Sequence, residues 1–133
     1  MARRSDPLEE LLGPLEQDVM EVVWQLDDAT VRDVHDRLAK RRKIAYTTVM
    51  TTMTRLATKG LLRRDTASLA HRYRPAVSRD DYARTTVANV LGWLVDRYPE
   101  PAASYLSEVV GEVDDDTIER LRGAVERRRR QER

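Results

Sequence analysis

The sequence predicts a mostly α-helical fold with one β-hairpin, and two patterns lead to this prediction. Six segments carry apolar residues three or four positions apart, which is the spacing of one face of a helix. One further segment, around Tyr73, alternates polar and apolar residues and ends at Pro75, as a short strand does. With 133 residues, the chain is long enough for one small domain and an oligomerisation arm.

Three helices are expected in the first half of the chain, at residues 14–26, 31–42 and 46–59. Pro14 suits a first helical turn, where its missing N–H costs nothing. Thr30 is a candidate N-cap for the second helix, and Gly60 suits the position just after the third. Thr52 falls near the inner side of the third helix, so we expect its hydroxyl to bond to the preceding turn.

A β-hairpin is expected next, with strands at 61–65 and 70–75 and a loop between them. The alternation around Tyr73 turns that ring towards the core and the flanking arginines outwards. Three helices followed by a hairpin is the order of a winged helix-turn-helix. We therefore expect this domain over residues 14–77, after an N-terminal extension at 1–13.

Residues 78–133 are expected to form three more helices, at about 79–98, after Pro99 and from Asp114 onwards. Their apolar faces are too one-sided to form a convincing core of their own. We interpret the region as a C-terminal three-helix dimerisation arm that packs on a second copy, with packing on the same chain as the alternative. The residues expected at the dimer contact are Val87, Val90, Leu91, Leu94, Tyr105, Leu106, Val109, Ile118 and Leu121.

Positive charge is concentrated in one segment, although the formal net charge of the chain is only +1. Between Lys40 and Arg74 there are ten basic residues and a single acid, Asp65. A local positive field in a nearly neutral chain is typical of a nucleic-acid face. The alternative, an ordinary solvated surface, usually mixes both signs of charge.

The third helix has the outward chemistry that a DNA major groove requires: hydroxyls, methyl groups and a long cation. Basic residues before the helix suit phosphate contact, and the arginines beside Tyr73 face solvent or DNA. The predicted DNA-binding residues are Arg42, Lys43, Tyr46, Thr47, Thr48, Met50, Thr51, Thr54, Arg55, Arg72 and Arg74. A threonine-rich face can also be plain solvated surface, so the prediction depends on the basic segment and the hairpin together.

Other classes of function find little support in the sequence. Cysteine is absent, which removes thiolate nucleophiles, disulfides and thiolate metal sites. No HExxH motif or phosphate-binding glycine loop is present, so an enzyme is not expected. We expect no metal and no cofactor, because His35 fits a core histidine better than a metal ligand, and His71 lies in the predicted wing, where phosphate contact is equally plausible.

No apolar run approaches the roughly 18 residues that span a bilayer, and the first residues lack the apolar core of a signal peptide. The chain is therefore expected in the cytoplasm. A winged helix used for contact with another protein remains an alternative, and a salt titration separates the two because DNA affinity falls steeply with salt.

Several motifs resemble the penicillinase-repressor family, the BlaI/MecI/CopY group. The resemblance rests on Leu15–Trp24 (LEQDVMEVVW), Val31–Val34 (VRDV), Ala45–Thr51 (AYTTVMT), Arg55–Gly60 (RLATKG) and Arg72–Pro75 (RYRP). The resemblance is close over residues 15–75, and over the rest of the chain only the pattern of expected helices is similar.

The resemblance implies a homodimer that represses a nearby gene from a palindromic operator, often built on a TACA/TGTA dyad. In one branch of the family, a membrane sensor triggers cleavage of an Asn–Phe bond in the arm. This chain has no phenylalanine, and its one asparagine, Asn89, precedes Val90, so that switch is not expected. The cysteine-based copper switch of another branch is excluded, and the inducer or sensor protein is left open.

Overall fold

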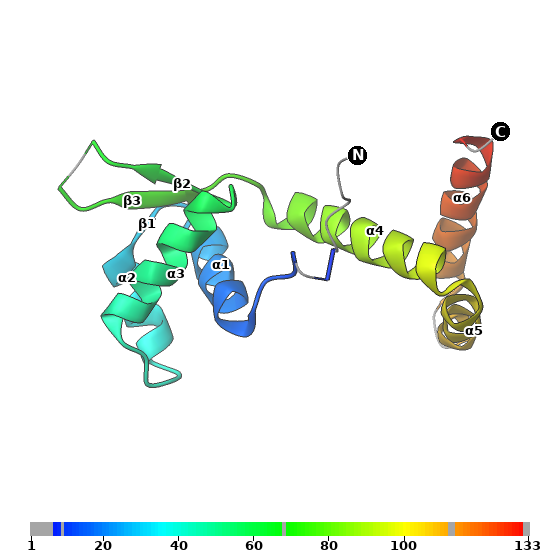
Figure 1. The fold of residues 1–133 in the computed structure, drawn as a ribbon, viewed down its shortest axis with the longest axis horizontal. Coiled ribbons are helices and arrows are strands. Elements are labelled where there is room, and N and C mark those ends of the chain that lie inside the picture. The colour runs from blue at the N-terminus through cyan, green and yellow to red at the C-terminus, as the bar shows by residue number, and fades with distance from the viewer. Residues whose placement is uncertain (1–6, 9, 68, 112–113, 132–133) are drawn as a thin grey trace. The chain divides into compact units, whose positions relative to one another are not determined.

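The computed structural model describes residues 7–8, 10–67, 69–111 and 114–131, and for Val110, Leu121 and Arg128 it describes the backbone alone. The chain divides into two compact units, the first ending at Val90 and the second beginning at Leu91. Figure 1 shows the elements of both. The first unit holds α1 (Pro14–Leu26), β1 (Ala29–Thr30), α2 (Val31–Ala39), α3 (Tyr46–Thr58), β2 (Leu62–Asp65), β3 (Arg72–Pro75) and the start of α4 (Arg79–Arg97).

Helices α1 and α2 begin at local caps. The Glu16 carboxylate accepts a hydrogen bond from the Gly13 N–H at 3.2 Å and so closes the start of α1. Thr30 caps α2 as predicted, because its hydroxyl accepts from the Asp33 N–H at 3.1 Å while the Asp33 carboxylate accepts from the Thr30 N–H at 2.9 Å. Asp27 caps the C-terminus of α1 and takes a left-handed conformation with φ of 65°.

Helix α2 ends at Ala39, three residues before the expected end at Arg42. The N–H groups of Arg41 and Arg42 both bond to the Leu38 carbonyl, which tightens the chain into a turn. The run of basic residues therefore lies in the turn between α2 and α3 and not in a last helical turn. The charge pattern suits either position, but the chain has to reverse here to pack α3 against α2.

Helix α3 fits the predicted bounds closely. Its N-terminus follows Ala45, and Gly60 just after it has φ of +83°, the left-handed conformation that glycine adopts without steric cost. Thr52 is buried, and its hydroxyl donates to the Thr48 carbonyl at 2.8 Å, as predicted. Val49, Met53 and Leu56 are fully buried on the same helix, so one face of α3 is fixed in the core.

The three strands form one antiparallel sheet in the order β1-β3-β2. In the hairpin, Arg64 lies opposite Tyr73 and Arg63 lies opposite Arg74. Ala29 of β1 pairs with Tyr73 from the other side, which makes β3 the central strand. The sequence did not predict this third strand, because two residues are too few to show an alternation.

The core of the first unit joins the helices to the sheet. The buried apolar residues are Val19, Met20, Val22, Val23, Ala29, Val31, Val34, Leu38, Val49, Met53, Leu56, Leu62 and Tyr73. They come from α1, α2, α3 and all three strands, so the helix-turn-helix and the wing share one core. The predicted winged helix-turn-helix in a mostly α-helical chain is confirmed.

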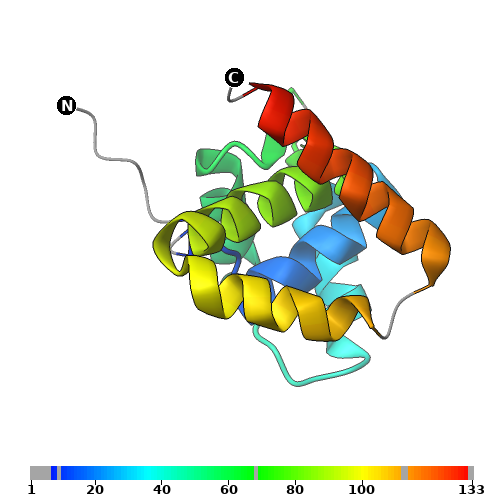
Figure 2. The same cartoon turned by 90° about the vertical axis from the view of Figure 1, so that its right-hand side faces the viewer.

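The second unit holds the end of α4, α5 (Pro99–Val110) and α6 (Asp115–Gln131). Figure 2 shows α5 and α6 along their lengths. The Asp114 carboxylate accepts a hydrogen bond from the Thr117 N–H at 2.7 Å and caps α6. Hydrogen bonds from the side chain and the backbone of Thr117 lower the pKa of Asp114. None of the side chains described after Ser78 is buried.

Candidate nucleic-acid interface

The outward face of α3 is open to solvent along its length. The predicted contact residues on it are all exposed, namely Tyr46, Thr47, Thr48, Met50, Thr51, Thr54 and Arg55. The inner face is held by fully buried Val49, Met53 and Leu56. This arrangement presents short polar groups and one methionine on a rigid helix, which suits reading base edges in a major groove.

The first residue of α3 is fixed by its neighbours. The Tyr46 ring meets the His35 ring edge to face, with centroids 5.8 Å apart. Nε2 of His35 lies 2.9 Å from the Ile44 carbonyl oxygen. His35 is thus a half-buried histidine with a backbone partner, as expected, and it supports the chain just before α3.

Threonine hydroxyls on α3 fall into two groups. Thr54 donates to the Met50 carbonyl at 3.0 Å, and Thr58 donates to the Thr54 carbonyl at 3.1 Å. Their hydroxyl protons are engaged within the helix, so each offers only lone pairs and a methyl group outwards. Thr47 and Thr51, nearer the N-terminus, make no such bond to any part of the chain that is described.

A groove of about 770 Å³ lies between α3 and the wing. Its lining joins exposed α3 residues to Arg32 at the start of α2 and to Arg64 and His71 on the wing. The lining residues are Thr30, Val31, Arg32, Tyr46, Met50, Thr51, Thr54, Arg55, Arg64, Leu69, Ala70, His71 and Tyr73. Three of them are arginines and none is acidic, so the groove attracts a polyanion.

The predicted wing arginines lie on the other side of the hairpin. Arg72 and Arg74 alternate with buried Tyr73, as expected. The Arg72 guanidinium Nε lies 3.0 Å from an Asp28 carboxylate oxygen, and an Arg74 nitrogen lies 3.6 Å from the other oxygen of that carboxylate. Neither arginine lines the groove, and the shared acid offsets part of their charge.

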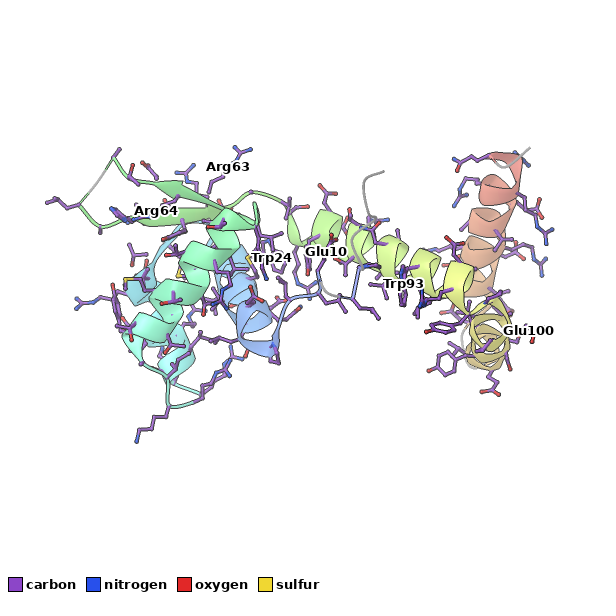
Figure 3. All side chains as sticks on the ribbon, viewed as in Figure 1. Glu10, Trp24, Arg63, Arg64, Trp93 and Glu100 are labelled. Carbon is purple, nitrogen blue, oxygen red and sulfur yellow. The ribbon has the colours of Figure 1, made fainter. Side chains whose placement is uncertain are left out.

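Arg64 is the wing cation that the sequence analysis missed. It lies opposite Tyr73 in the hairpin register, so both side chains are on the face of the sheet that meets the helices. Figure 3 shows Arg63 pointing away from the helices and Arg64 on the other side of the hairpin. Side chains alternate between the two faces of a strand, so the pairing of Arg64 with Tyr73 places both side chains on the same face. The sequence predicts this only when the register of the two strands is known.

The turn before α3 presents two predicted phosphate contacts in different ways. Lys43 is exposed. The Arg42 guanidinium pairs with the Asp18 carboxylate on α1, which ties the turn to the first helix. An ion pair this exposed is weak in water, so a phosphate can compete for Arg42.

The end of α3 is tied to the start of α1. Lys59 Nζ lies 2.8 Å from a Glu16 carboxylate oxygen. Burial alone would raise the pKa of Glu16, but the hydrogen bonds from Lys59 and the Gly13 N–H, with the charges of Lys59 and Arg55, lower it overall. One carboxylate therefore fixes the helix that carries the candidate contacts.

The predicted dimer residues remain accessible in the single chain. Val87, Leu91, Tyr105 and Leu106 are exposed, and Val90, Leu94, Val109 and Ile118 are half-buried. The side chain of Leu121 lies outside the described part of the structure.

Across the described residues, no three His, Asp or Glu side chains gather as a metal site would require. None of the helices in this part of the chain is both long and apolar enough to cross a membrane.

Comparison with known proteins identifies the relatives of this chain. The family model described as penicillinase repressor matches residues 12–127. The transcriptional regulator BlaI from two strains of Mycobacterium tuberculosis, CDC 1551 / Oshkosh and ATCC 25618 / H37Rv, is 39% identical over 115 residues, which covers 86% of this chain and 82% of BlaI.

Two solved structures of BlaI are similar to part of the chain. The solution structure of the monomeric form of Bacillus licheniformis BlaI in complex with the blaP half-operator is 26% identical, with a TM-score of 0.47, and covers 54% of this chain and 88% of that one. The solution structure of the DNA-binding domain of the repressor BlaI is 27% identical, with a TM-score of 0.48. The match covers 53% of this chain and 87% of that one.

The family and both M. tuberculosis relatives are transcriptional regulators, so the prediction of a regulator and not an enzyme is confirmed. The resemblance seen in the motifs is confirmed as well. On a family match over most of its length and 39% identity to two such regulators, this chain belongs to the penicillinase repressor family.

Proposed function

We propose that this protein is a homodimeric repressor that binds a palindromic operator through α3 and the wing. The observation that carries the proposal is the groove between them, which is lined by Arg32, Arg55 and Arg64 and by no acid. A DNA backbone carries one phosphate charge at each nucleotide, and guanidinium groups bind it well. With α3 in a major groove, the adjoining backbone would run along this groove.

Base readout is assigned to the N-terminal part of α3. Thr47, Thr48 and Thr51 are exposed there, and their hydroxyls and methyl groups can reach base edges and thymine methyls. Met50 is exposed on the same stretch although it is apolar, which fits contact with a thymine methyl. Arg55, one turn further along, is placed to contact a guanine or a phosphate.

Dimerisation is proposed from apolar surface that the single chain leaves in water. In the second unit, Leu91, Val95, Tyr98, Tyr105, Leu106 and Val125 are exposed. Apolar patches of this kind on a small soluble protein usually mark a contact surface, and a second copy is the simplest partner because symmetric dimers are the commonest oligomers. Two copies place two α3 helices on two half-sites about one DNA turn apart.

Repression would follow from occupancy, because a bound dimer excludes polymerase from the promoter. A signal that separates the two copies would relieve repression, since each half then binds DNA alone and avidity is lost. A small ligand or a sensor protein could deliver such a signal. The proposed function requires access to DNA, which agrees with the expected cytoplasmic location.

The test is selection of genomic DNA fragments by the purified full chain at near-physiological salt, followed by titration of the selected site. We expect one palindrome and an affinity that falls steeply with salt. Arg55→Ala should weaken binding about tenfold or more, because a charge-assisted contact is lost. Arg37→Ala, which removes a charge outside the groove, is the matched control. Enrichment without any motif, or equal losses in the two variants, would contradict the proposal.

A further inference from the structure

The wing holds one arginine in place through a histidine and not through an acid. Nε of Arg64 on β2 donates to Nδ1 of His71 at 3.0 Å, and Nη2 of Arg64 contacts the same nitrogen. The two residues are diagonal neighbours on one face of the hairpin, because Arg64 lies opposite Tyr73 and His71 is two residues before Tyr73. Both line the groove beside α3.

The chemistry of the pair decides which ring nitrogen of His71 accepts the hydrogen bond. A guanidinium can only donate hydrogen bonds, so Nδ1 of His71 has to be the acceptor. Arg64 uses the edge formed by Nε and Nη2 for this contact, which leaves the N–H groups of Nη1 and the outer N–H of Nη2 for another acceptor.

The contrast with the other wing arginines shows what the pair achieves. Arg72 and Arg74 share the Asp28 carboxylate, which offsets part of their charge. His71 orients Arg64 while leaving its full positive charge in place. An oriented cation that keeps its charge is the better ligand for a phosphate, because less side-chain entropy is lost on binding.

We propose that Arg64 is the wing residue that binds a phosphate of the DNA backbone, and that His71 is its positioning residue. The proposal rests on the proposed function, because it assigns a further contact to the same groove. The ligand is the backbone phosphate next to the half-site read by α3. Such a contact adds affinity and fixes the position of the wing, but it carries no base preference of its own.

The experiment measures dissociation constants of the full chain for its selected operator duplex and for a scrambled duplex, by fluorescence anisotropy across a range of salt. The variants are Arg64→Ala, His71→Ala, the double variant and His71→Gln, whose amide oxygen can accept the same hydrogen bond. Arg63→Ala removes an equal charge from the opposite face of the hairpin and is the matched control. Thermal unfolding checks that each variant keeps its fold.

We expect Arg64→Ala to weaken binding to both duplexes about tenfold, by a similar factor, and to lower the slope of log K against log salt by about 0.9. His71→Ala should weaken binding about threefold and add nothing to Arg64→Ala in the double variant, because it acts through Arg64. His71→Gln should restore most of the loss. Arg63→Ala should change binding less than twofold.

Several results would overturn the inference. Multiplying losses in the double variant would mean that His71 binds DNA itself, and equal losses for Arg63 and Arg64 would mean that only net charge matters. A loss confined to the operator duplex would indicate base reading. If the unmodified chain selects no operator, the proposed function fails; if it binds its operator and Arg64→Ala changes nothing, the phosphate contact alone is wrong.

Discussion

The two units of this chain differ in how far they bury their apolar residues. The first unit buries thirteen of them between three helices and a sheet, with Val19, Met53 and Leu56 fully out of water. In the second unit, from Leu91 onwards, none of the described side chains is buried, and Tyr105 is two-thirds exposed. The first unit therefore has the core of a folded domain, whereas the second leaves apolar side chains accessible, as the proposed dimer contact would require.

This difference suggests that the two units have different roles, DNA contact in the first and dimer contact in the second. The unit that carries the candidate DNA contacts has a buried core within one chain, and this core joins α3 to the wing. The helices after Leu91 leave several apolar side chains exposed in the single chain, where the proposed dimer contact would cover them. The following predictions test this comparison, beginning with the largest expected effect.

Leu56→Ala should lower the free energy of unfolding of the first unit by about 3 kcal/mol, because it leaves a cavity in a closed core. Leu91→Ala, which removes the same atoms from an exposed position, should change this quantity by less than about 0.5 kcal/mol. Urea unfolding of both variants in a Trp93→Phe background, followed by Trp24 fluorescence, measures the first unit alone. Equal losses of unfolding free energy in the two variants would mean that the two units do not differ in how they bury apolar side chains.

Leu91→Asp should separate the proposed dimer, because a charge would have to be buried at the contact. Sedimentation should then show a monomer, and operator affinity should fall about a hundredfold or more as avidity is lost. The melting of the first unit should be unchanged. Asn89→Asp adds the same charge on another side of α4 and should leave the dimer intact. A Leu91→Asp variant that binds at full strength would refute the role of the arm.

Trp24→Phe should destabilise the first unit by about 1 kcal/mol. Trp24 Nε1 donates to the Val77 carbonyl at 3.0 Å, and its ring lies 5.6 Å from the Tyr82 ring at the start of α4. Phenylalanine keeps an aromatic ring there but loses the hydrogen bond. Thermal unfolding by circular dichroism gives the loss, and Trp93→Phe in the second unit is the control. An equal shift in the two variants would show that the Val77 bond contributes nothing.

Glu16→Gln should have the smallest effect, below about 1 kcal/mol at neutral pH. The pKa of Glu16 is lower in the folded chain than its ordinary value of 4.5, so the native protein favours the charged carboxylate. The stabilisation is therefore complete above pH 4.5 and is lost as pH falls through the lowered value. Unfolding free energies from pH 7 to pH 3 should converge for the variant and the unmodified chain, and a constant difference would be inconsistent with this linkage.

Local signals predicted most of the fold. Pro14, Thr30 and Gly60 marked helix boundaries because capping depends on neighbouring residues only, and the alternation around Tyr73 gave its burial. The predicted end of α2, at Arg42, was wrong. The helix stops at Ala39 because the chain turns there to pack α3 against α2, and no local sequence pattern shows this packing. The third strand was missed since Ala29 and Thr30 take part only through pairing with β3.

The candidate site was predictable along α3 and less so on the wing. The outward face of a helix follows from its periodicity, and every predicted contact on α3 is exposed. On the wing, the alternation showed that Arg72 and Arg74 point away from the core but not that Asp28 lies beside them. The place of Arg64 in the groove depends on the register across the hairpin, which the sequence of one strand does not contain.

The threonine hydroxyls of α3 have a consequence for dehydration. Exposed Thr54 and Thr58 each donate to a carbonyl four residues earlier in the same helix. When another molecule covers this helix, these hydroxyls lose water only from their oxygen lone pairs, because their protons are already bonded within the helix. Dehydrating a polar group without a new partner is costly, so this part of the helix can be covered at a lower cost than its count of hydroxyls implies.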